Sequence, residues 1–367
     1  SIWQAMGSDE KNAFASPWSM VMALGMTYGG AKKETAKEMA KVLKLRLPQR
    51  KLHAAHGAMI SSLRGTMKKD HDDLVVANSI WPHKGFKIKA PFVKLLKKNY
   101  GIGIRRLDFE GSPATNAGII NGWVEHWTNG MVKKLLKPTN VPKQTRLVLV
   151  NTIYFKGDWV KPFKKHATGE RPFHLASGTT IRVPTMVQTN QFELLDSKTF
   201  QALRMRYKGR RMLMDVVLPK KKGTIKAVEK ELASKGFQLP RLRFKSKRLR
   251  VAMPKFKISK RVKLNGVLKK MGMVRAFDRK KAKFTGITPP KKYGFYIGEV
   301  IHKAVCEVNE RGTKAAAATA VAMVPGTAAP QKPETFTVDR PFMMVIRDTK
   351  TNAVLFVGRV MNPKAEK

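Results

Sequence analysis

The sequence has one cysteine, few acidic residues and no long apolar run. The single Cys306 excludes an intramolecular disulfide. Because no run reaches about eighteen apolar residues, we expect no transmembrane helix, and no basic segment followed by an apolar stretch indicates a signal peptide. An Asn-x-Ser/Thr glycosylation acceptor is also missing. These absences leave the compartment open.

The shortage of acidic residues makes the chain strongly basic. Asp plus Glu number 25 against 73 Lys plus Arg, which gives a formal net charge of +48. Such a field attracts polyanions and keeps copies of the protein apart in solution. A resurfaced, solubility-driven exterior would show the same excess. Because basic pairs lie between apolar residues throughout the chain, a disordered basic tail is excluded.

The densest basic block covers residues 241–263, with eleven basic residues and no acid. Alternation of basic and apolar residues at its start predicts a strand with a basic face toward solvent. The alternation changes phase at Lys247-Arg248, which predicts a β-bulge or a strand break. The block fits either an ordinary solvent face or a surface for heparin or nucleic acid, because many clustered anion contacts add up. The candidate polyanion-binding residues are Arg241, Arg243, Lys245, Lys247, Arg248 and Arg250, joined by a basic helix with Arg50, Lys51, Arg64, Lys68 and Lys69.

Helical periodicity predicts several helices along the chain. One begins at Ser16-Pro17 and ends at Gly29-Gly30, and a second covers about residues 33–45. Another lies within residues 117–136, and its predicted apolar face consists of Ile119, Ile120, Trp123, Val124 and Trp127.

Two further segments predict strands. Residues 146–159 form a continuous apolar run rich in β-branched side chains, which is typical of a strand covered on both faces. Residues 336–363 predict a hairpin around a turn from Asp348 to Asn352. Helices and strands are interspersed without a βαβ series, which indicates an α+β fold. No linker divides the chain, so we expect a single domain over residues 1–367.

The search for catalytic chemistry finds little. His53 and His56 have a helical spacing that could present two metal ligands, but no third ligand follows, and we interpret them as solvent-facing. Cys306 lies in an alternating strand pattern and is expected to be a small core residue. The segment GIGIRR at residues 101–106 has two glycines but lacks the third glycine of a dinucleotide-binding loop. We therefore expect no enzyme, no cofactor and no metal.

Four segments together resemble the serpin family of protease inhibitors. They are FASPWS at residues 14–19, NTIYFKGDWVKPF at 151–163, VIHKAVCEVNERGTKAAAATA at 300–320 and DRPFMMVIRDTKTNAVLFVGRVMNP at 339–363. They follow the family's order and spacing over essentially the whole chain. The resemblance implies an inhibitory member, unusually basic or resurfaced, with three β-sheets, eight to nine helices and an exposed reactive-centre loop at about residues 310–335.

The resemblance also gives the uncharged, alanine-rich segment between Lys314 and Lys332 a function. In serpins a protease cleaves this loop and forms an acyl-enzyme, and the freed segment inserts as a new strand in the largest sheet. Small side chains fit such a gap, and Lys314, where the family usually has an acidic residue, would face solvent. The hinge pattern corresponds here to Glu310, Gly312, Thr313, Ala315, Ala316, Ala317 and Ala318.

Further residues match positions that the family uses to control insertion. Ser16, Ser19, Asn151 and His302 match a hydrogen-bonded cluster that controls how the central strands part. Trp159 matches the tryptophan at the top of that sheet, where insertion starts. For each residue alone, a packed core position is the alternative interpretation.

The family's spacing from Glu310 places the reactive bond between Gly326 and Thr327. Because the segment is a few residues longer than usual, Met323 and Val324 are alternative specificity residues. No Lys or Arg lies between Ala315 and Gln331. The resemblance therefore favours an elastase-like, subtilisin-like or chymotrypsin-like target over a trypsin-like one.

Two other functions compete with inhibition: a non-inhibitory carrier with the same fold, and a protein that binds heparin or nucleic acid. The small hinge residues argue against the carrier. We expect a monomer without a membrane partner, and the resemblance favours an extracellular location.

Overall fold

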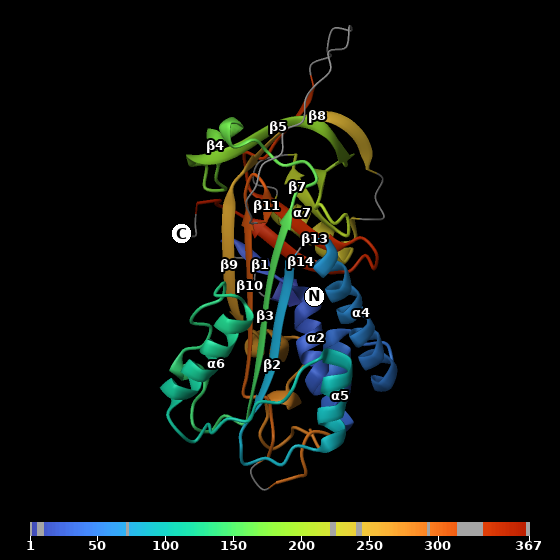
Figure 1. The fold of residues 1–367 in the computed structure, drawn as a ribbon, viewed down its shortest axis with the longest axis vertical. Coiled ribbons are helices and arrows are strands. Elements are labelled where there is room, and N and C mark those ends of the chain that lie inside the picture. Colours follow the sequence, from blue (N-terminus) through green and yellow to red (C-terminus); the bar gives the residue numbers. More distant parts are fainter. Residues whose placement is uncertain are drawn as a thin grey trace.

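The computed structural model describes residues 2–5, 11–70, 73–220, 225–239, 244–291, 294–313 and 333–364. These residues form eight α-helices and fourteen strands in an α+β arrangement (Figure 1). The helices are α1 (Ile2–Ala5), α2 (Pro17–Tyr28), α3 (Lys33–Leu43), α4 (Gln49–Asp70), α5 (Ala90–Tyr100), α6 (Pro113–Trp127), α7 (Ile225–Ser234) and α8 (Leu264–Lys270). No helix in the described ranges is long and apolar enough to cross a membrane.

A five-stranded sheet runs along the length of the molecule. Its order is β11-β3-β10-β9, with β2 paired to β3. β3 and β10 are parallel, whereas β2, β9 and β11 are antiparallel to their neighbours. The strands are β2 (Asp73–Pro82), β3 (Leu147–Asp158), β9 (Phe256–Lys263), β10 (Glu299–Val308) and β11 (Gly312–Thr313).

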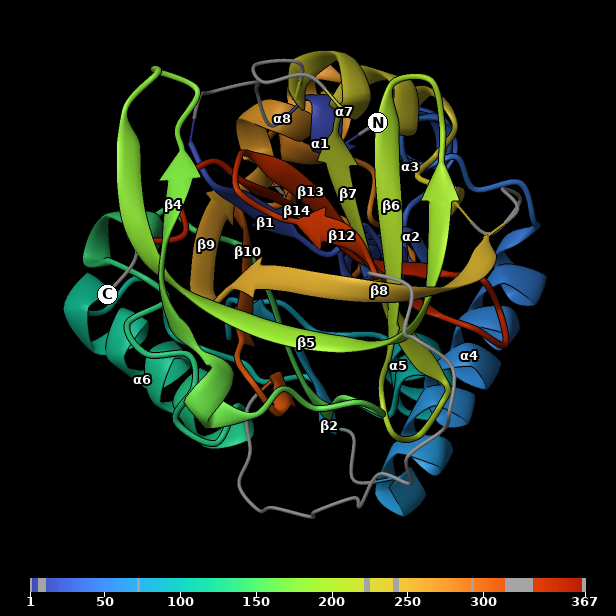
Figure 2. The same ribbon diagram turned by 90° about the horizontal axis from the view of Figure 1, so that it is seen from above.

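A nine-stranded ladder lies across the upper end of this sheet. The long strand β5 pairs with β4 and β8 along most of its length and with β6 only over its last residues, so it joins two parts of the ladder (Figure 2). These two parts and the five-stranded sheet agree with the expected serpin α+β fold. The strands are β1 (Ala13–Ala15), β4 (Gly169–His174), β5 (Thr180–Asp196), β6 (Phe200–Arg206), β7 (Met212–Pro219), β8 (Lys245–Pro254), β12 (Glu334–Thr337), β13 (Phe342–Asp348) and β14 (Val354–Val360).

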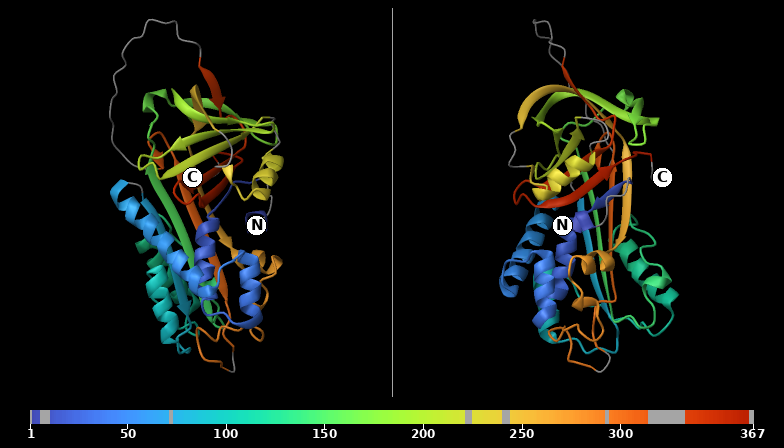
Figure 3. Two further views of the ribbon diagram at one scale, coloured as in Figure 1. Left: turned by 90° about the vertical axis from the view of Figure 1, so that its right-hand side faces the viewer. Right: turned by 180° about the vertical axis from the view of Figure 1, so that it is seen from behind.

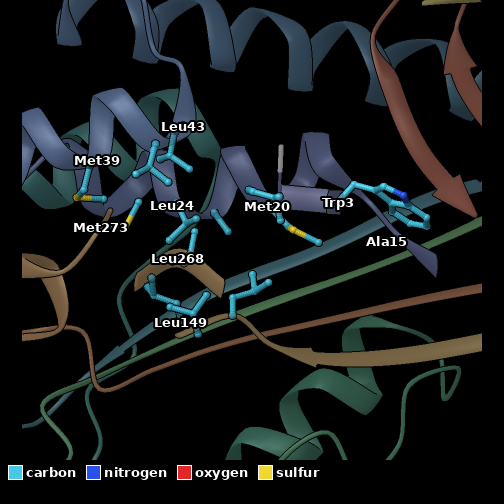
Figure 4. Close-up of a cluster of buried hydrophobic side chains, with 14 of the residues drawn as sticks. Trp3, Ala15, Met20, Leu24, Met39, Leu43, Leu149, Leu268 and Met273 are labelled. Carbon is cyan, nitrogen blue, oxygen red and sulfur yellow. The ribbon is translucent and has the colours of Figure 1, made fainter. Parts of the chain in front are cut away.

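Both faces of β3 are covered, as its continuous apolar sequence predicts. Leu147 and Leu149 lie in the core shared with α2, α5 and α8, whereas Val148 and Val150 lie in the core beneath α6. In the right-hand view of Figure 3, α6 and the blue helices lie on opposite sides of the long strands. Figure 4 shows Leu24 of α2 close to Leu149 and to Leu268 of α8. The long sheet is therefore the middle layer of the lower half of the molecule.

The helix α2 begins as its sequence predicts. Ser16 is the N-cap, its Oγ accepts the backbone N–H of Ser19 at 3.1 Å, and Pro17 occupies the first turn. This bond satisfies one of the donors that a helix start leaves free. The helix ends at Tyr28, directly before Gly29-Gly30, and the predicted second helix and C-terminal hairpin are also confirmed.

Two details of the sequence interpretation are wrong. In α6, Ile120 and Val124 are buried, but Ile119 and Trp127 are 46% and 52% exposed, because the helix rests on the sheet along only one narrow stripe. In β8, each residue from Lys245 onward pairs with one residue of β5, so the strand has no bulge. Its basic start simply extends beyond the core, and burial begins at Leu249.

Candidate functional site

The site is built around the seam between β3 and β10, defined here as the parallel pairs from Val148–Glu299 to Tyr154–Val305. A row of three buried polar residues crosses this sheet. Asn78 on β2 is opposite Asn151 on β3, and Asn151 is opposite His302 on β10. All three side chains are buried. Buried polar groups are costly unless they are bonded, so their partners determine how the seam holds.

The polar side chains of the row are hydrogen-bonded to one another and to α2. Asn151 Nδ2 donates to Asn78 Oδ1 at 2.5 Å, and Asn151 Oδ1 lies 2.5 Å from His302 Nδ1. Ser19 Oγ donates to the same Oδ1 at 3.0 Å. The backbone N–H of Ser16 donates to His302 Nε2 at 3.2 Å. Asn151 thus links three strands to the first turn of α2.

This pattern requires a neutral His302. Its Nε2 accepts from a backbone N–H, so its Nδ1 must carry the proton that is donated to Asn151. Burial lowers the pKa of His302 to about 3. The imidazole therefore acts as a fixed bridge between β10 and α2.

At the upper end of the seam, Trp159 holds the turn that follows β10. Its indole Nε1 donates to Asn309 O at 3.1 Å, and its backbone N–H donates to Arg311 O at 2.6 Å. The buried ring stacks on Tyr207, with ring centroids 4.4 Å apart. Trp159 thus fixes where the chain leaves β10.

Glu310 anchors the same turn from the other side. Its backbone oxygen accepts from Phe163 N at 2.7 Å, and its Oε1 accepts from Lys255 Nζ and Thr168 Oγ1, both at 2.9 Å. Burial alone raises the pKa of Glu310, but the hydrogen bond from Lys255, together with bonds from its own backbone and Thr168, outweighs burial and lowers it. The turn is therefore held on both sides before the hinge begins.

Gly312 reverses the chain toward β3. Its φ of 147° lies outside the range that side chains favour, and a Cβ there would lie 2.0 Å from Gly157 O. Gly312 pairs with Asp158 and Thr313 pairs with Gly157, antiparallel to β3. Only glycine allows this close approach. Two residues of the chain, Gly312 and Thr313, are therefore already paired with the C-terminal end of β3.

The other hinge residues and the reactive bond lie outside the described residues. These are Ala315, Ala316, Ala317, Ala318, Met323, Val324, Gly326 and Thr327. Arg241 and Arg243 of the basic block also lie outside them. In the described part of that block, Lys245, Arg248 and Arg250 are exposed, whereas Lys247 is half-buried and its Nζ donates to Glu334 at 2.8 Å.

The interpretation of His53 and His56 as solvent-facing is wrong. Their exposed fractions are 2% and 7%, and their Nδ1 atoms lie 2.8 and 3.0 Å from Tyr100 Oη between α4 and α5. Burial lowers the pKa of both to about 4, and for His56 the neighbouring His53 adds to the effect. No group of three or more metal-ligating side chains occurs in the described ranges.

Cys306 is buried in β10, as expected, and burial raises the pKa of its thiol. The sequence interpretation missed three residues of the site: Asn78, Lys255 and Tyr207. Asn78 had a signal, because a lone amide interrupts the apolar run of β2. Lys255 and Tyr207 had none, because their partners are distant in the sequence.

The chain is similar to known proteins along nearly its whole length. It matches the family model described as "Serpin (serine protease inhibitor)" over residues 2–363. It is 35% identical to an uncharacterised serpin-like protein of Thermococcus kodakarensis over 99% of this chain and 83% of that protein. It is 34% identical to human serpin B4 over 97% of this chain and 95% of that protein.

Two solved structures have the same fold. Native protease nexin-1 with heparin aligns with a TM-score of 0.84 at 30% identity, over 96% of this chain and 92% of that one. Tengpin, a thermophilic serpin in its native state, aligns with a TM-score of 0.86 at 27% identity, over 98% and 91% of the two chains. With the polar row, the Trp159 turn and the glycine hinge in place, these similarities show that the chain belongs to the serpin family.

Proposed function

We propose that this serpin is a suicide-substrate inhibitor of serine proteases. A protease cleaves the loop and forms an acyl-enzyme, and the loop then inserts between β3 and β10 before the ester is hydrolysed. The observation that supports this most is the pairing of Gly312 and Thr313 with the end of β3. Insertion would extend this antiparallel pairing along the seam.

The energetics favour insertion once the loop is cut. About ten inserted residues with roughly two backbone hydrogen bonds each, at about 1 kcal/mol net per bond, contribute on the order of 20 kcal/mol. This exceeds the stability of a typical domain, about 5–15 kcal/mol. The uncut protein is then held by kinetics, and the hydrogen bond between Asn151 and His302 is part of the barrier because insertion must separate β3 from β10.

The target follows from the loop sequence. We infer cleavage between Gly326 and Thr327, with Met323 or Val324 as alternatives, and a protease whose pocket takes small or apolar side chains. Elastase-like, subtilisin-like and chymotrypsin-like enzymes meet this requirement. We infer a single domain that acts as a monomer and performs no catalysis of its own; the family match over residues 2–363 supports the single domain and its inhibitory role.

A hinge variant tests the mechanism. The wild type mixed with pancreatic elastase should give a covalent complex that survives detergent. In Thr313→Arg, a charged side chain would have to enter the seam first. We therefore expect elastase to cleave the loop of this variant without forming the covalent complex. The matched control is Lys314→Arg, which keeps its charge at the next, outward position and should still form the complex. If both variants trap the protease equally, insertion does not begin at residue 313.

Thermal unfolding gives a second test that needs no trapped protease. Cleavage between Met323 and Ala329 should raise the melting temperature strongly, because the loop becomes a strand. An unchanged melting temperature after cleavage would favour a non-inhibitory carrier.

Heparin binding is a second candidate function, supported by one structural neighbour and by exposed basic residues on β8. Protease nexin-1, a structural neighbour, was solved with heparin. Here Lys245, Arg248 and Arg250 are exposed on β8. We propose that heparin binds this part of the basic block, and that its affinity falls steeply with salt as bound counterions are released. Retention on a heparin column that does not change with salt would contradict this.

A further inference from the structure

The lower end of the molecule contains a cavity that neither proposed function uses. It lies among residues 279–291 and 294–295, in the orange part of the chain at the bottom of Figure 1, opposite the end that carries β11. Its volume is about 450 Å³, within the range of about 300–1,000 Å³ that suits small-molecule ligands. The lining residues that matter here are Arg279, Lys280, Lys283, Lys291, Phe284 and Phe295.

The rim of this cavity is cationic. The described residues of this segment, 278–291 and 294–295, contain one acid, Asp278, against five Lys and Arg residues. Asp278 does not line the cavity, and its Oδ1 accepts the backbone N–H groups of Lys280 and Lys281 at 2.7 and 2.9 Å. The side chains of Lys280 and Lys283 are exposed, and the described part of the chain shows no ion pair for either ammonium group, although Asp278 is close enough to Lys280 to interact with it electrostatically. Their ammonium groups are available to an anion.

The floor of the cavity is apolar. Phe284 and Phe295 are buried and meet edge to face, with ring centroids 6.3 Å apart. Phe295 also packs on Phe86 at 4.9 Å. Lys291 Nζ lies 5.6 Å from the centre of the Phe86 ring and donates to Gly85 O at 2.5 Å. The floor is thus a packed aromatic surface next to fixed positive charge.

Close backbone contacts hold the walls in place. A Cβ on Gly286 would lie 2.9 Å from Gly30 Cα, and Gly286 N donates to Gly30 O at 3.0 Å. Gly294, with φ of 61°, approaches Arg279 so closely that a Cβ would lie 2.2 Å from Arg279 O. The cavity is therefore formed before any ligand arrives, which lowers the entropic cost of binding.

We propose that this cavity binds small molecules that join an anionic group to a flat apolar body, such as an aromatic sulfate, phosphate or carboxylate. The basic rim concentrates anions in a concave site, and the exposed Pro289 and Pro290, backed by the buried Phe284 and Phe295, receive the ring. Both features are needed, because a bare anion would gain nothing from the apolar lining and a neutral ring would gain nothing from the ammonium groups.

Calorimetry on the full chain at about 0.15 M salt tests this, with 2-naphthalenesulfonate as the probe. We expect one bound probe per chain. The neutral 2-naphthalenemethanol and inorganic sulfate should each bind at least about tenfold more weakly. The double variant Lys280→Gln/Lys283→Gln should weaken the probe by about tenfold or more, because two rim charges are lost.

The matched control is Lys164→Gln/Lys165→Gln, two exposed lysines next to Phe163, whose N–H donates to Glu310 O, so the same charge is removed at the upper end of the molecule. This control should bind the probe within about twofold of the wild type. Equal weakening in both variants would overturn the proposal, because general charge would then explain binding. Sulfate or naphthalenemethanol binding as well as the probe would also overturn it. No protease is present, so the outcome does not depend on the inhibitory function.

Discussion

Two strand pairs at the centre of the protein, β3–β10 and β7–β13, are both buried but are held together differently. β3–β10 is parallel and is crossed by the neutral hydrogen bond that His302 Nδ1 donates to Asn151 Oδ1, to which Ser19 of α2 also donates. β7–β13 is antiparallel and is crossed by the buried ion pair of Asp215 with Arg347 at 2.5 Å. Parallel pairing is slightly weaker per residue, and neutral bonds are cheaper to break than buried charges are to separate.

The comparison shows that the strand pair that must open and the strand pair that keeps the fold together depend on different interactions. Asp215 also pairs with Arg204 of β6 at 2.9 Å, so three strands of the nine-stranded ladder meet at one carboxylate. Burial raises the pKa of Asp215, and the two arginines oppose this. The seam that must part for insertion is linked at its centre by neutral side chains, and its buried carboxylate Glu299, in the first pair of the seam, bonds to Lys263 of β9 rather than across β3 and β10. The four predictions below test this difference.

The largest effect is expected from acid. His302, His53 and His56 have folded-state pKa values of about 3, 4 and 4. The unfolded value is about 6.5, so the unfolded chain binds protons first as pH falls. Their stabilising contribution is complete above pH 6.5 and is lost as pH falls toward 4.

At pH 5 each histidine should lower the free energy of unfolding by about 2 kcal/mol relative to pH 7. Urea unfolding at the two values measures the sum, and His302→Gln should remove about a third of the pH dependence. A wild-type unfolding midpoint that does not move between pH 7 and 5 would contradict the neutral, buried state of these residues.

The next largest effect is expected at β7–β13. Asp215→Asn leaves the buried Arg347 without its carboxylate and leaves Arg204 with only its 3.3 Å pair to Glu193, which should cost about 3–5 kcal/mol in urea unfolding. The loss should be similar in the intact and the cleaved protein. The matched control is Arg206→Gln, which removes a more exposed pair with Glu193 and should cost less than about 1 kcal/mol. Equal losses in the two variants would mean that the buried ion pair stabilises the fold no more than the exposed pair does.

A smaller effect is expected in the seam itself. Asn151→Ala leaves the Nδ1–H of His302 and the hydroxyl of Ser19 without their acceptor, which should cost about 2–3 kcal/mol in the intact protein. After cleavage and insertion the strands are already apart, so the loss should shrink. A loss that is the same before and after cleavage would show that these bonds do not guard the opening.

The smallest effect is expected at the hinge support. Trp159→Phe keeps a ring against Tyr207 but removes the bond to Asn309 O, which should cost about 1 kcal/mol. The control Trp127→Phe, on the exposed side of α6, should stay within about 0.5 kcal/mol of the wild type. Thermal unfolding compares the two, and a larger loss at Trp127 would reverse the assignment.

Local features of the fold could be predicted from the sequence where neighbouring residues decide them. Ser16 and Pro17 define a helix start by themselves, and the apolar run of β3 can only suit a strand covered on both sides. The stripe of Leu52, His53, His56 and Leu63 has a helical spacing that points to burial. The histidines were misplaced because their polarity was given more weight than this period.

Contacts between distant strands could not be predicted in the same way. The meeting of Arg204, Asp215 and Arg347 depends on the registers of β6, β7 and β13, which no local pattern contains. The exposure of Ile119 and Trp127 depends on how α6 lies on the sheet. The polar row was found only through the family resemblance, and Asn78 was missed because that resemblance was applied one residue at a time.

The single cysteine can report when β10 becomes exposed to solvent. Cys306 is buried in the strand that borders the seam, and its raised pKa keeps the thiol protonated and slow to react. A maleimide added to the resting molecule would label it only during excursions that expose this strand. With no other thiol in the chain to compete, the labelling rate would count those excursions without any mutation or attached dye.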